Sequence, residues 1–256
     1  MLMAVDVGNT QTVLGLFEGE EPLGKWRIAT EVHRTADELA VFFAGLLALE
    51  GLRLDAVDAV IVSSVVPGLT RSYRNLASEV FEVPFYGVIA EMETGLDNRY
   101  DDPGEVGADR IVNAVAAGRH YGFPAIIVDI GTATTVEAVN GEACYLGGAI
   151  LTGLYVSLEA LVSRTAKLPS VDLEEAPPRV IATNTPDSIR SGFIYGYAGA
   201  VDALIRRSRE ELGEDGVKVV ATGGPAGVIV PYCREIHEFD PDLTLKGLLA
   251  LYEMNA

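Results

Sequence analysis

Two short segments of the chain share one order of residues that could hold a nucleotide and a metal ion. Asp6-Val7-Gly8-Asn9-Thr10 closes an apolar run near the start, and Asp129-Ile130-Gly131-Thr132-Ala133-Thr134-Thr135 closes another in the middle. In both segments an acid precedes a glycine and then hydroxyl or amide side chains. Glycine lets backbone N–H groups approach a phosphate closely, and Mg²⁺ prefers oxygen ligands. One copy alone would fit an ordinary turn after a strand, but the repeat predicts two related halves around one nucleotide.

Two other motifs carry groups suited to binding a small molecule. Gly107-Ala108-Asp109-Arg110 joins a long loop to a predicted helix. Asp109 could accept a hydrogen bond from a substrate hydroxyl, and Arg110 could pair with a carboxylate or phosphate through its planar fork. An aspartate helix cap beside a surface arginine is the alternative. Thr222-Gly223-Gly224 follows a predicted strand, where the glycines either admit a flat ring such as adenine or form a tight turn.

Glycines recur along one face of a predicted long helix, at Gly192, Gly196 and Gly199. This spacing makes a smooth face that another element can approach closely. Packing within the chain and a subunit interface are both consistent with it. The neighbouring aromatic residues favour a core or an interface over a cofactor site; they are Phe193, Tyr195 and Tyr197.

Composition narrows the class of protein. The chain has 256 residues, 49% hydrophobic and 22% charged, which is typical of a globular protein with an ordinary core. A formal charge of −18 argues against nucleic acid or an anionic membrane as a general partner. Two cysteines and three scattered histidines predict neither a disulfide framework nor a zinc site. The longest apolar run, Ala40 to Leu49, is too short to span a bilayer, so a cytoplasmic location is expected.

The predicted elements follow the order strand, loop, strands, helix, strand, and this order occurs twice. Such a pattern fits an α/β fold with mixed sheets, in which ligands bind at strand ends. The expected halves are residues 1–120 and 121–256, with a cleft between them and a functional loop at 91–108. Thr185 is the expected N-cap of the long helix, with Pro186 at its first helical position. The predicted strands span 1–7, 12–17, 24–30, 56–66, 125–128, 134–139, 143–150 and 217–221, and the predicted helices span 35–49, 69–80, 109–121, 152–168, 185–212 and 243–254.

These motifs together resemble the type III pantothenate kinases, over nearly the whole chain. The resemblance implies the acetate and sugar kinase/Hsp70/actin fold, with two duplicated ribonuclease-H-like domains and mixed five-stranded sheets. It implies ATP-dependent phosphorylation of pantothenate to 4′-phosphopantothenate, the first step of coenzyme A synthesis. It also implies a homodimer, Mg²⁺ with the nucleotide, and K⁺ or NH₄⁺. The segments that carry it are Asp6-Val7-Gly8-Asn9-Thr10, Gly107-Ala108-Asp109-Arg110, Asp129 to Thr135, Gly147-Gly148, Arg164-Thr165-Ala166-Lys167-Leu168-Pro169 and Thr222-Gly223-Gly224.

The resemblance also implies a role for each residue that matches a family motif. Asp109 is the implied base that faces the pantothenate hydroxyl, and Arg110 pairs with the pantothenate carboxylate. Asp129 ligates the monovalent cation, and Asp6 is a candidate Mg²⁺ ligand. Thr185 reaches pantothenate from the partner subunit. The implied nucleotide contacts are Asp6, Val7, Gly8, Asn9, Thr10, Gln11, Thr12, Val13 and Thr132, and the implied pantothenate contacts are Tyr100, Gly107, Ala108, Asp109, Arg110 and Thr185.

Three positions depart from the family pattern and leave local loop shape open. Glu137 stands where an aspartate is common, Thr152 replaces a frequent proline, and Ala182 replaces a frequent glycine. A rival function is a nucleotide-binding transcriptional accessory protein of the same fold without kinase activity. Loss of Asp6 or Asp109 would favour that rival, and both residues are present.

Overall fold

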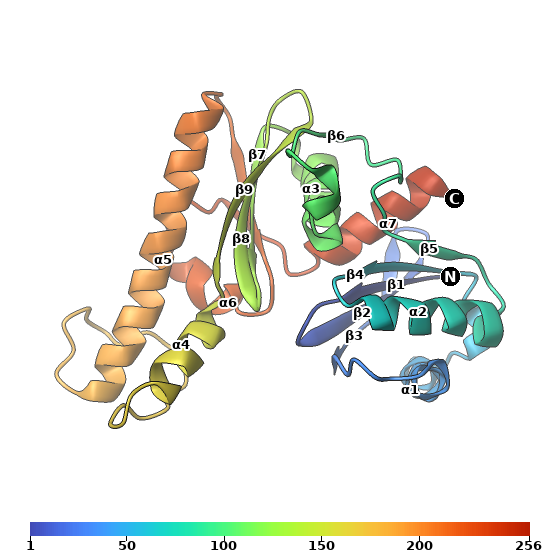
Figure 1. Cartoon of the computed structure of the whole chain (residues 1–256), viewed down its shortest axis with the longest axis horizontal. Coiled ribbons are helices and arrows are strands. Elements are labelled where there is room, and N and C mark those ends of the chain that lie inside the picture. Colours follow the sequence, from blue (N-terminus) through green and yellow to red (C-terminus); the bar gives the residue numbers. More distant parts are fainter. The chain divides into compact units, whose positions relative to one another are not determined.

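Two β-sheets of related topology organise the chain, and the computed structural model describes all 256 residues (Figure 1). One compact unit comprises Met1–Gly95, Asp101–Arg119 and Leu243–Ala256, and the other comprises Leu96–Tyr100 and His120–Asp242. Each unit contains one sheet and the helices that cover it. No helix has both the length and the apolar character needed to cross a membrane.

The first sheet has the strand order β3-β2-β1-β4-β5. β1, β2 and β3 form an antiparallel meander, and β4 and β5 continue parallel to β1. The helices α1 (Ala36–Leu49) and α2 (Pro67–Asn75) pack on one face, and a π-helical turn (Leu76–Phe81) extends α2. Thr35 and Glu38 cap α1 reciprocally, which is the capping-box arrangement. The strands are β1 (Leu2–Val7), β2 (Gln11–Glu18), β3 (Glu21–Ala29), β4 (Ala59–Ser64) and β5 (Phe85–Gly87).

The second sheet repeats this topology and adds one strand. Its order is β11-β10-β7-β8-β9-β6, so β7 corresponds to β1, β10 to β4 and β9 to β3. The directions also match, because β7, β8 and β9 are antiparallel while β10 and β11 run parallel to β7. The expectation of five strands is therefore wrong for this sheet, which has six. The strands are β6 (Asp97–Asn98), β7 (Ala125–Ile130), β8 (Ala133–Val139), β9 (Cys144–Thr152), β10 (Lys218–Thr222) and β11 (Glu238–Phe239).

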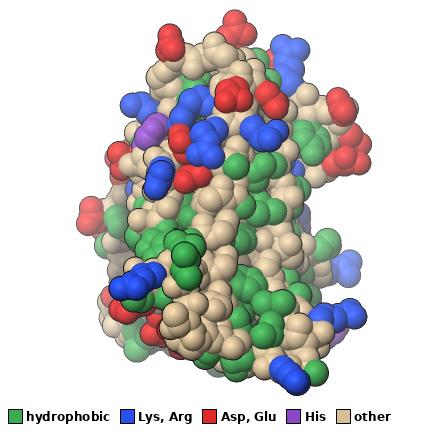
Figure 2. Space-filling model, turned by 90° about the vertical axis from the view of Figure 1, so that its left-hand side faces the viewer, with side chains coloured by type: hydrophobic (Ala, Val, Ile, Leu, Met, Phe, Trp, Pro, Cys, Tyr) green, Lys and Arg blue, Asp and Glu red, His purple; other side chains and the backbone are tan.

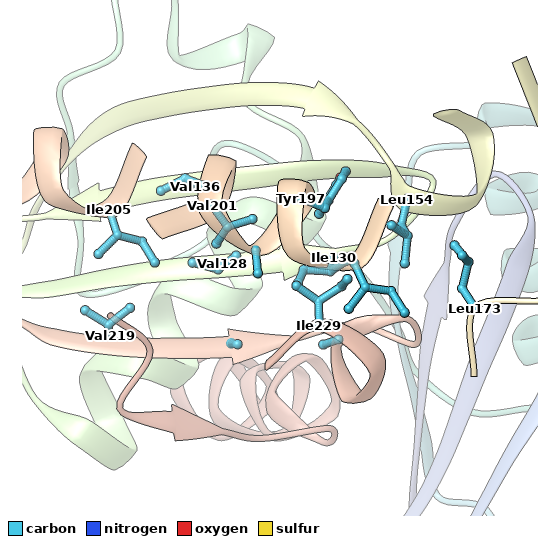
Figure 3. Close-up of a cluster of buried hydrophobic side chains, with 14 of the residues drawn as sticks. Val128, Ile130, Val136, Leu154, Leu173, Tyr197, Val201, Ile205, Val219 and Ile229 are labelled. Carbon is cyan, nitrogen blue, oxygen red and sulfur yellow. The ribbon is translucent and has the colours of Figure 1, made fainter. Parts of the chain in front are cut away.

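The long helix α5 (Thr185–Leu212) supplies much of the core of the second unit. Tyr197, Val201 and Ile205 point from α5 toward β-strand residues such as Val128 and Val136 (Figure 3). Leu154 from α4 (Leu154–Ser163) and Ile229 from α6 (Ala226–Ile229) complete this cluster. The apolar residues of β7 and β8 therefore determine where α5 lies.

Several predicted boundaries are corrected by the structure. β4 is shorter than predicted, because Leu54–Ala56 forms a 3₁₀ turn, and α4 ends at Ser163 rather than near 168. The N-cap of α5 is Asn184, whose side chain accepts a hydrogen bond from the Asp187 backbone at 2.9 Å. Thr185 therefore lies in the first turn with an exposed side chain.

The compact units differ from the expected division at residue 120. The last helix, α7 (Leu243–Asn255), packs against β1, β2 and β4 of the first sheet, although it follows the second sheet in sequence. Its apolar residues Leu245, Leu248 and Leu251 are buried. A boundary inferred from chain order does not reveal such a return.

We predict that Gly247→Ala destabilises the fold. Gly247 of α7 lies so close to α3 (Ala108–Tyr121) that a Cβ would sit 2.2 Å from the Val112 backbone oxygen. The substitution should cost about 3 kcal/mol of the free energy of unfolding, because backbone must move. The measurement is urea denaturation followed by circular dichroism.

The matched control is Gly45→Ala in α1, where a Cβ meets nothing within 4 Å. This change should stabilise the protein by about 0.5–1 kcal/mol, because alanine favours helix. Equal urea midpoints for the two variants would contradict the proposed close approach of α3 and α7.

Candidate active site

Each sheet carries an acid beside a buried hydroxyl at the carboxyl ends of two parallel strands. Asp6 is the fifth of six residues in β1 and lies opposite Ser63 of β4. Asp129 is the fifth of six residues in β7 and lies opposite Thr222 of β10. Both acids are half-buried, while Ser63 and Thr222 are 0% and 2% exposed. The two halves therefore carry equivalent polar residues at the carboxyl edge of each sheet, which is where α/β proteins bind small molecules.

Ser63 is the residue of this arrangement for which no chemical role was predicted. Its hydroxyl oxygen is buried and has no hydrogen-bond partner among the protein atoms. Aligning the two halves of the sequence residue by residue would have placed Ser63 with Thr222. A buried polar atom at this position fits a site whose ligands are oxygens.

The first loop, residues 8–10, is held in shape by Thr30, which directly follows β3. Thr30 donates its hydroxyl to the Gly8 backbone oxygen at 2.8 Å, and its backbone N–H donates to the Thr10 oxygen at 3.0 Å. The hydroxyls of Thr12 and Thr30 are 2.9 Å apart, and Thr12 is 1% exposed. Thr12 therefore anchors the loop, whereas Asn9, Thr10 and Gln11 are exposed.

A buried tyrosine, Tyr73, contacts this loop through Thr12. Burial raises the pKa of Tyr73 in α2, and a hydrogen bond with Thr12 acts in the opposite direction. Tyr73 also packs edge-on against Phe43 of α1, with ring centroids 6.2 Å apart. The helical layer is thereby connected to the loop through Thr12.

The second loop depends on two glycines that belong to other elements. A Cβ on Gly153 would lie 2.1 Å from the Gly131 oxygen, and the Gly153 N–H donates to the Thr132 oxygen at 3.0 Å. Gly223 has a φ of +99°, and a Cβ there would lie 2.7 Å from Asp129 Oδ1. Gly223 therefore leaves room for the Asp129 carboxylate, a role that the interpretation as a ring-binding surface did not include.

The hydroxyl side chains of the second loop divide between surface and core. Thr132 is exposed, but Thr134 is fully buried. The Tyr197 hydroxyl lies 2.7 Å from Thr134 Oγ1 and 2.7 Å from the Thr152 backbone oxygen. Burial raises the pKa of Tyr197. Thr134 thus holds the loop to α5, and Thr132 remains the candidate nucleotide contact.

The Gly107-Ala108-Asp109-Arg110 motif forms the start of α3. The Gly107 oxygen accepts the Arg110 N–H at 3.1 Å, and Asp109 Oδ1 accepts the same N–H at 2.9 Å. A Cβ on Gly107 would lie 2.6 Å from Asp109 Oδ1, so any larger residue here would displace the Asp109 carboxylate from this position. Arg110 is only 8% exposed, so the interpretation as a surface arginine is wrong.

The remaining candidates lie in the second unit. Tyr100 follows β6 and is half-buried against β9, and Thr185 lies exposed at the start of α5. Within the first unit the structure groups Asp6 to Val13 with Ser63. Within the second unit it groups Asp129 and Thr132 with Thr222. No three or more His, Cys, Asp and Glu side chains are clustered so as to hold a metal ion.

A groove of about 520 Å³ runs along the glycine face of α5. A Cβ on Gly192, Gly196 or Gly199 would meet nothing within 4 Å, so no element of this chain packs there. Hydrophobic side chains gather over the lower part of this side of the molecule, and charged ones over its upper part (Figure 2). The groove is lined by Leu161, Leu168, Thr185, Ser188, Ile189, Gly192, Phe193, Gly196, Tyr197 and Ala200.

Solved structures place the fold in a known class. The chain is similar to a putative Baf family transcriptional activator from Campylobacter jejuni, with a TM-score of 0.62, 17% identity, and 98% and 97% of the two chains covered. It is also similar to (R)-2-hydroxyglutaryl-CoA dehydratase component A from Acidaminococcus fermentans, with a TM-score of 0.54, 15% identity, and coverage of 98% and 96%. An inorganic polyphosphate/ATP-glucomannokinase from Arthrobacter has a TM-score of 0.51, 12% identity, and coverage of 99% and 97%. These similarities show the actin-like kinase and ATPase fold, as the sequence predicts.

Sequence comparison identifies the family. The model of the type III pantothenate kinases matches residues 2–207. The type III pantothenate kinase of Rubrobacter xylanophilus is 67% identical over 260 residues, covering 100% of this chain and 98% of the relative. That of Pelobacter propionicus is 47% identical over 255 residues, covering all of both chains. The chain belongs to the type III pantothenate kinase family, and the prediction from its motifs is confirmed.

Proposed function

We propose that the chain transfers the γ-phosphoryl group of ATP to the primary hydroxyl of pantothenate. The product is 4′-phosphopantothenate, formed in the first step of coenzyme A synthesis. The observation that carries this proposal is the full-length match to relatives named type III pantothenate kinase. A cytoplasmic location is part of the proposal.

Asp109 is the base of the proposed reaction. Phosphoryl transfer needs positioning and charge neutralisation more than covalent chemistry from the protein. A carboxylate is a much weaker base than an alkoxide, so the proton of the hydroxyl moves late, as the bond to phosphorus forms. At the start of α3 the Asp109 side chain accepts the backbone N–H of Arg110, which holds the carboxylate in one orientation.

Selection of pantothenate is assigned to the Asp109 motif and to Tyr100. Arg110 carries a guanidinium fork that suits the pantothenate carboxylate. Gly107 and Ala108 present backbone close to the substrate, and Tyr100 is the proposed aromatic wall of the pocket. This assignment rests on the family motif at the start of α3 and on the burial of Arg110.

The nucleotide is proposed to bind at the two loops. The exposed residues Asn9, Thr10 and Gln11 suit contacts to phosphate from the first loop, and Thr132 suits one from the second. Asp6 beside Ser63 offers oxygen donors that fit Mg²⁺, which keeps several waters and binds through few carboxylates plus phosphates. When bound with ATP, Mg²⁺ neutralises charge on the phosphates.

A monovalent cation, K⁺ or NH₄⁺, is proposed at Asp129. Asp129 lies between Thr135 of β8 and Thr222 of β10 in the sheet register. One carboxylate flanked by hydroxyl oxygens fits a cation of low charge, and Gly223 leaves the carboxylate room. A bound cation would supply positive charge beside the phosphates.

Asp109→Asn should lose about 10²–10⁴-fold in kcat, because the amide cannot accept the proton. The Kd for ATP should change little. The measurement is coupled ADP release with and without pantothenate, which for the unaltered protein must depend on pantothenate. Glu105→Gln, which alters an exposed carboxylate in the same loop, is the control and should keep full turnover. Near-normal turnover by Asp109→Asn would refute the assignment of the base.

Asp129→Ala should abolish activation by K⁺. Its carboxylate is the proposed ligand, so the rate of the variant should no longer rise when K⁺ replaces Na⁺ at constant ionic strength. Asp215→Ala removes an exposed carboxylate of the same unit and should retain the response. An unchanged K⁺ response in Asp129→Ala would place the cation elsewhere.

A homodimer formed through α5 is part of the proposal. The groove along the glycine face is apolar, and nothing in the chain packs on it. Glycines at this spacing allow two helices to approach closely. Thr185 lines the same groove, so a second copy seated there would lie beside Thr185. Thr185 would then reach the pantothenate bound by the partner subunit.

Complementation between two inactive variants tests this arrangement. Co-expressed Asp109→Asn and Thr185→Val chains with different tags should regain activity in the purified heterodimer. One of its two sites then combines an intact Asp109 with an intact Thr185, so activity should reach about half that of the unaltered dimer. If Thr185 serves the site of its own subunit, both sites are defective and the heterodimer stays inactive. A monomer in analytical ultracentrifugation would also contradict the proposal.

A further inference from the structure

The sixth strand of the second sheet, β6, has no counterpart in the first sheet. It comes from the segment Leu96–Tyr100, which lies among residues of the first unit in sequence but packs with the second. β6 pairs in parallel with β9, with Asp97 opposite Cys144 and Asn98 opposite Tyr145. The duplicated fold does not require this strand, so its effect on the residue that follows it, Tyr100, is informative.

β6 fixes the backbone that leads into Tyr100. The Arg99 N–H donates to the Tyr145 oxygen at 2.9 Å. The Tyr100 N–H donates to Asn98 Oδ1 at 3.1 Å, which closes a local turn. Asp97 is bound through its N–H to the Ala143 oxygen at 3.0 Å and through its carboxylate to Arg99 at 2.6 Å. These bonds hold residues 97–100 against the edge of the sheet.

The ring of Tyr100 is fixed as well. Gly147 of β9 has a φ of +97°, and a Cβ there would lie 2.9 Å from a ring carbon of Tyr100. The register between β8 and β9 shifts at this place, leaving Leu146 as an extra residue. Such a bulge redirects the neighbouring side chains. Tyr100 therefore lies over bare backbone that only glycine provides.

Tyr145 forms the second wall beside Tyr100. The two rings have centroids 6.4 Å apart and planes tilted by 44°, within the range of favourable aromatic pairs. Tyr145 is fully buried, and its hydroxyl donates to Glu137 Oε2 at 2.5 Å. Glu137, in β8, is itself 1% exposed. A buried hydrogen bond to a carboxylate holds a ring in one position more firmly than apolar packing does.

We propose that Glu137 and Tyr145 are positioning residues that hold Tyr100 against pantothenate. Neither residue needs to touch the substrate. The Glu137 carboxylate fixes Tyr145, and Tyr145 together with Gly147 and β6 fixes the ring of Tyr100. This inference rests on the proposed function, because it takes Tyr100 as a wall of the pantothenate pocket. It assigns to the extra strand the task of setting affinity for pantothenate rather than for ATP.

Steady-state kinetics of Tyr145→Phe tests the proposal. The variant loses the bond to Glu137 but keeps the ring, so the KM for pantothenate should rise roughly five- to tenfold. The KM for ATP and kcat at saturating pantothenate should stay within about twofold. Glu137→Gln keeps an oxygen acceptor for Tyr145 and should restore most of the affinity that Glu137→Leu loses. If Tyr145→Phe fails to fold, Asn98→Ala breaks the turn at Tyr100 from the surface and should give the same separation of the two KM values.

Tyr121→Phe is the matched control. Tyr121 also donates to a carboxylate of the same unit, Asp240, at 2.9 Å. It lies outside the proposed clamp, so its loss should not change the KM for pantothenate. The double variant Tyr100→Ala/Tyr145→Phe should be no worse than Tyr100→Ala alone, because Tyr145 acts through Tyr100.

The failures of the two proposals are distinguishable. No pantothenate-dependent ADP release by the unaltered protein would refute the proposed function. If Tyr100→Ala raises the KM for pantothenate but Tyr145→Phe does not, the clamp is overturned and the function stands. An equal rise in both KM values for Tyr145→Phe would also overturn the clamp, because it would indicate a general structural role.

Discussion

The parallel pairing of two central strands, made once in each sheet, determines where the polar groups of the candidate site meet. Because β1 and β4 run in the same direction, their carboxyl ends share one edge, and Asp6 comes to lie beside Ser63. The same pairing of β7 and β10 brings Asp129 beside Thr222. Parallel strands cannot be joined by a tight turn, so a long connection that contains a helix joins the strands of each parallel pair. The hydrophobic core of each unit stabilises the pairing, through Val60 and Val62 of β4 in the first unit and through Val219 and Ala221 of β10 in the second.

Close backbone approach is the second requirement, and it explains glycines that have no chemistry of their own. Gly153 and Gly223 bring three separate segments around Asp129 and the second loop. Gly247 does the same for the helix that begins with the Asp109 motif, through its contact with Val112. A Cβ at any of these positions would overlap a backbone oxygen, so the chain cannot relax by turning a side chain. In each unit, close contacts between backbone segments rather than between side chains therefore hold these candidate residues in place.

The second unit departs from the first in ways that the duplication does not require. It carries the extra strand β6 and the long helix α5 with its open glycine face. Tyr197 connects α5 to the second loop, because it lines the groove and also bonds to Thr134 and Thr152. A contact made on α5 therefore lies one hydrogen bond, from Tyr197 to Thr134, away from the candidate phosphate-binding loop. Under the proposed function, α5 would contact both the partner subunit, through its groove, and the nucleotide-binding loop, through Tyr197.

The sequence by itself determined the class of the protein. The repeat of acid, glycine and hydroxyl is local in each half, and the apolar runs before Asp6 and Asp129 predict strands from their neighbours alone. The motifs resemble those of the type III pantothenate kinases, and this resemblance predicted the family, while the repeat predicted the duplicated topology; both are confirmed. Helix caps such as Thr35 with Glu38 also follow from adjacent residues.

Only the tertiary structure decided the partners of these residues, because those partners are distant in sequence. An alignment of the two halves matches Ser63 with Thr222, but only the strand pairing shows that Ser63 lies opposite Asp6. A two-residue strand such as β6 has too little pattern to be predicted. The return of α7 to the first sheet and the burial of Arg110 and Thr134 depend on packing between elements. The pairing of Glu137 with Tyr145 needs a bulge in β9 that no local signal gives. Local sequence patterns therefore determine the helices, the strands and the polar motifs. Packing between distant segments determines which side chains lie at the site and which hold them in place.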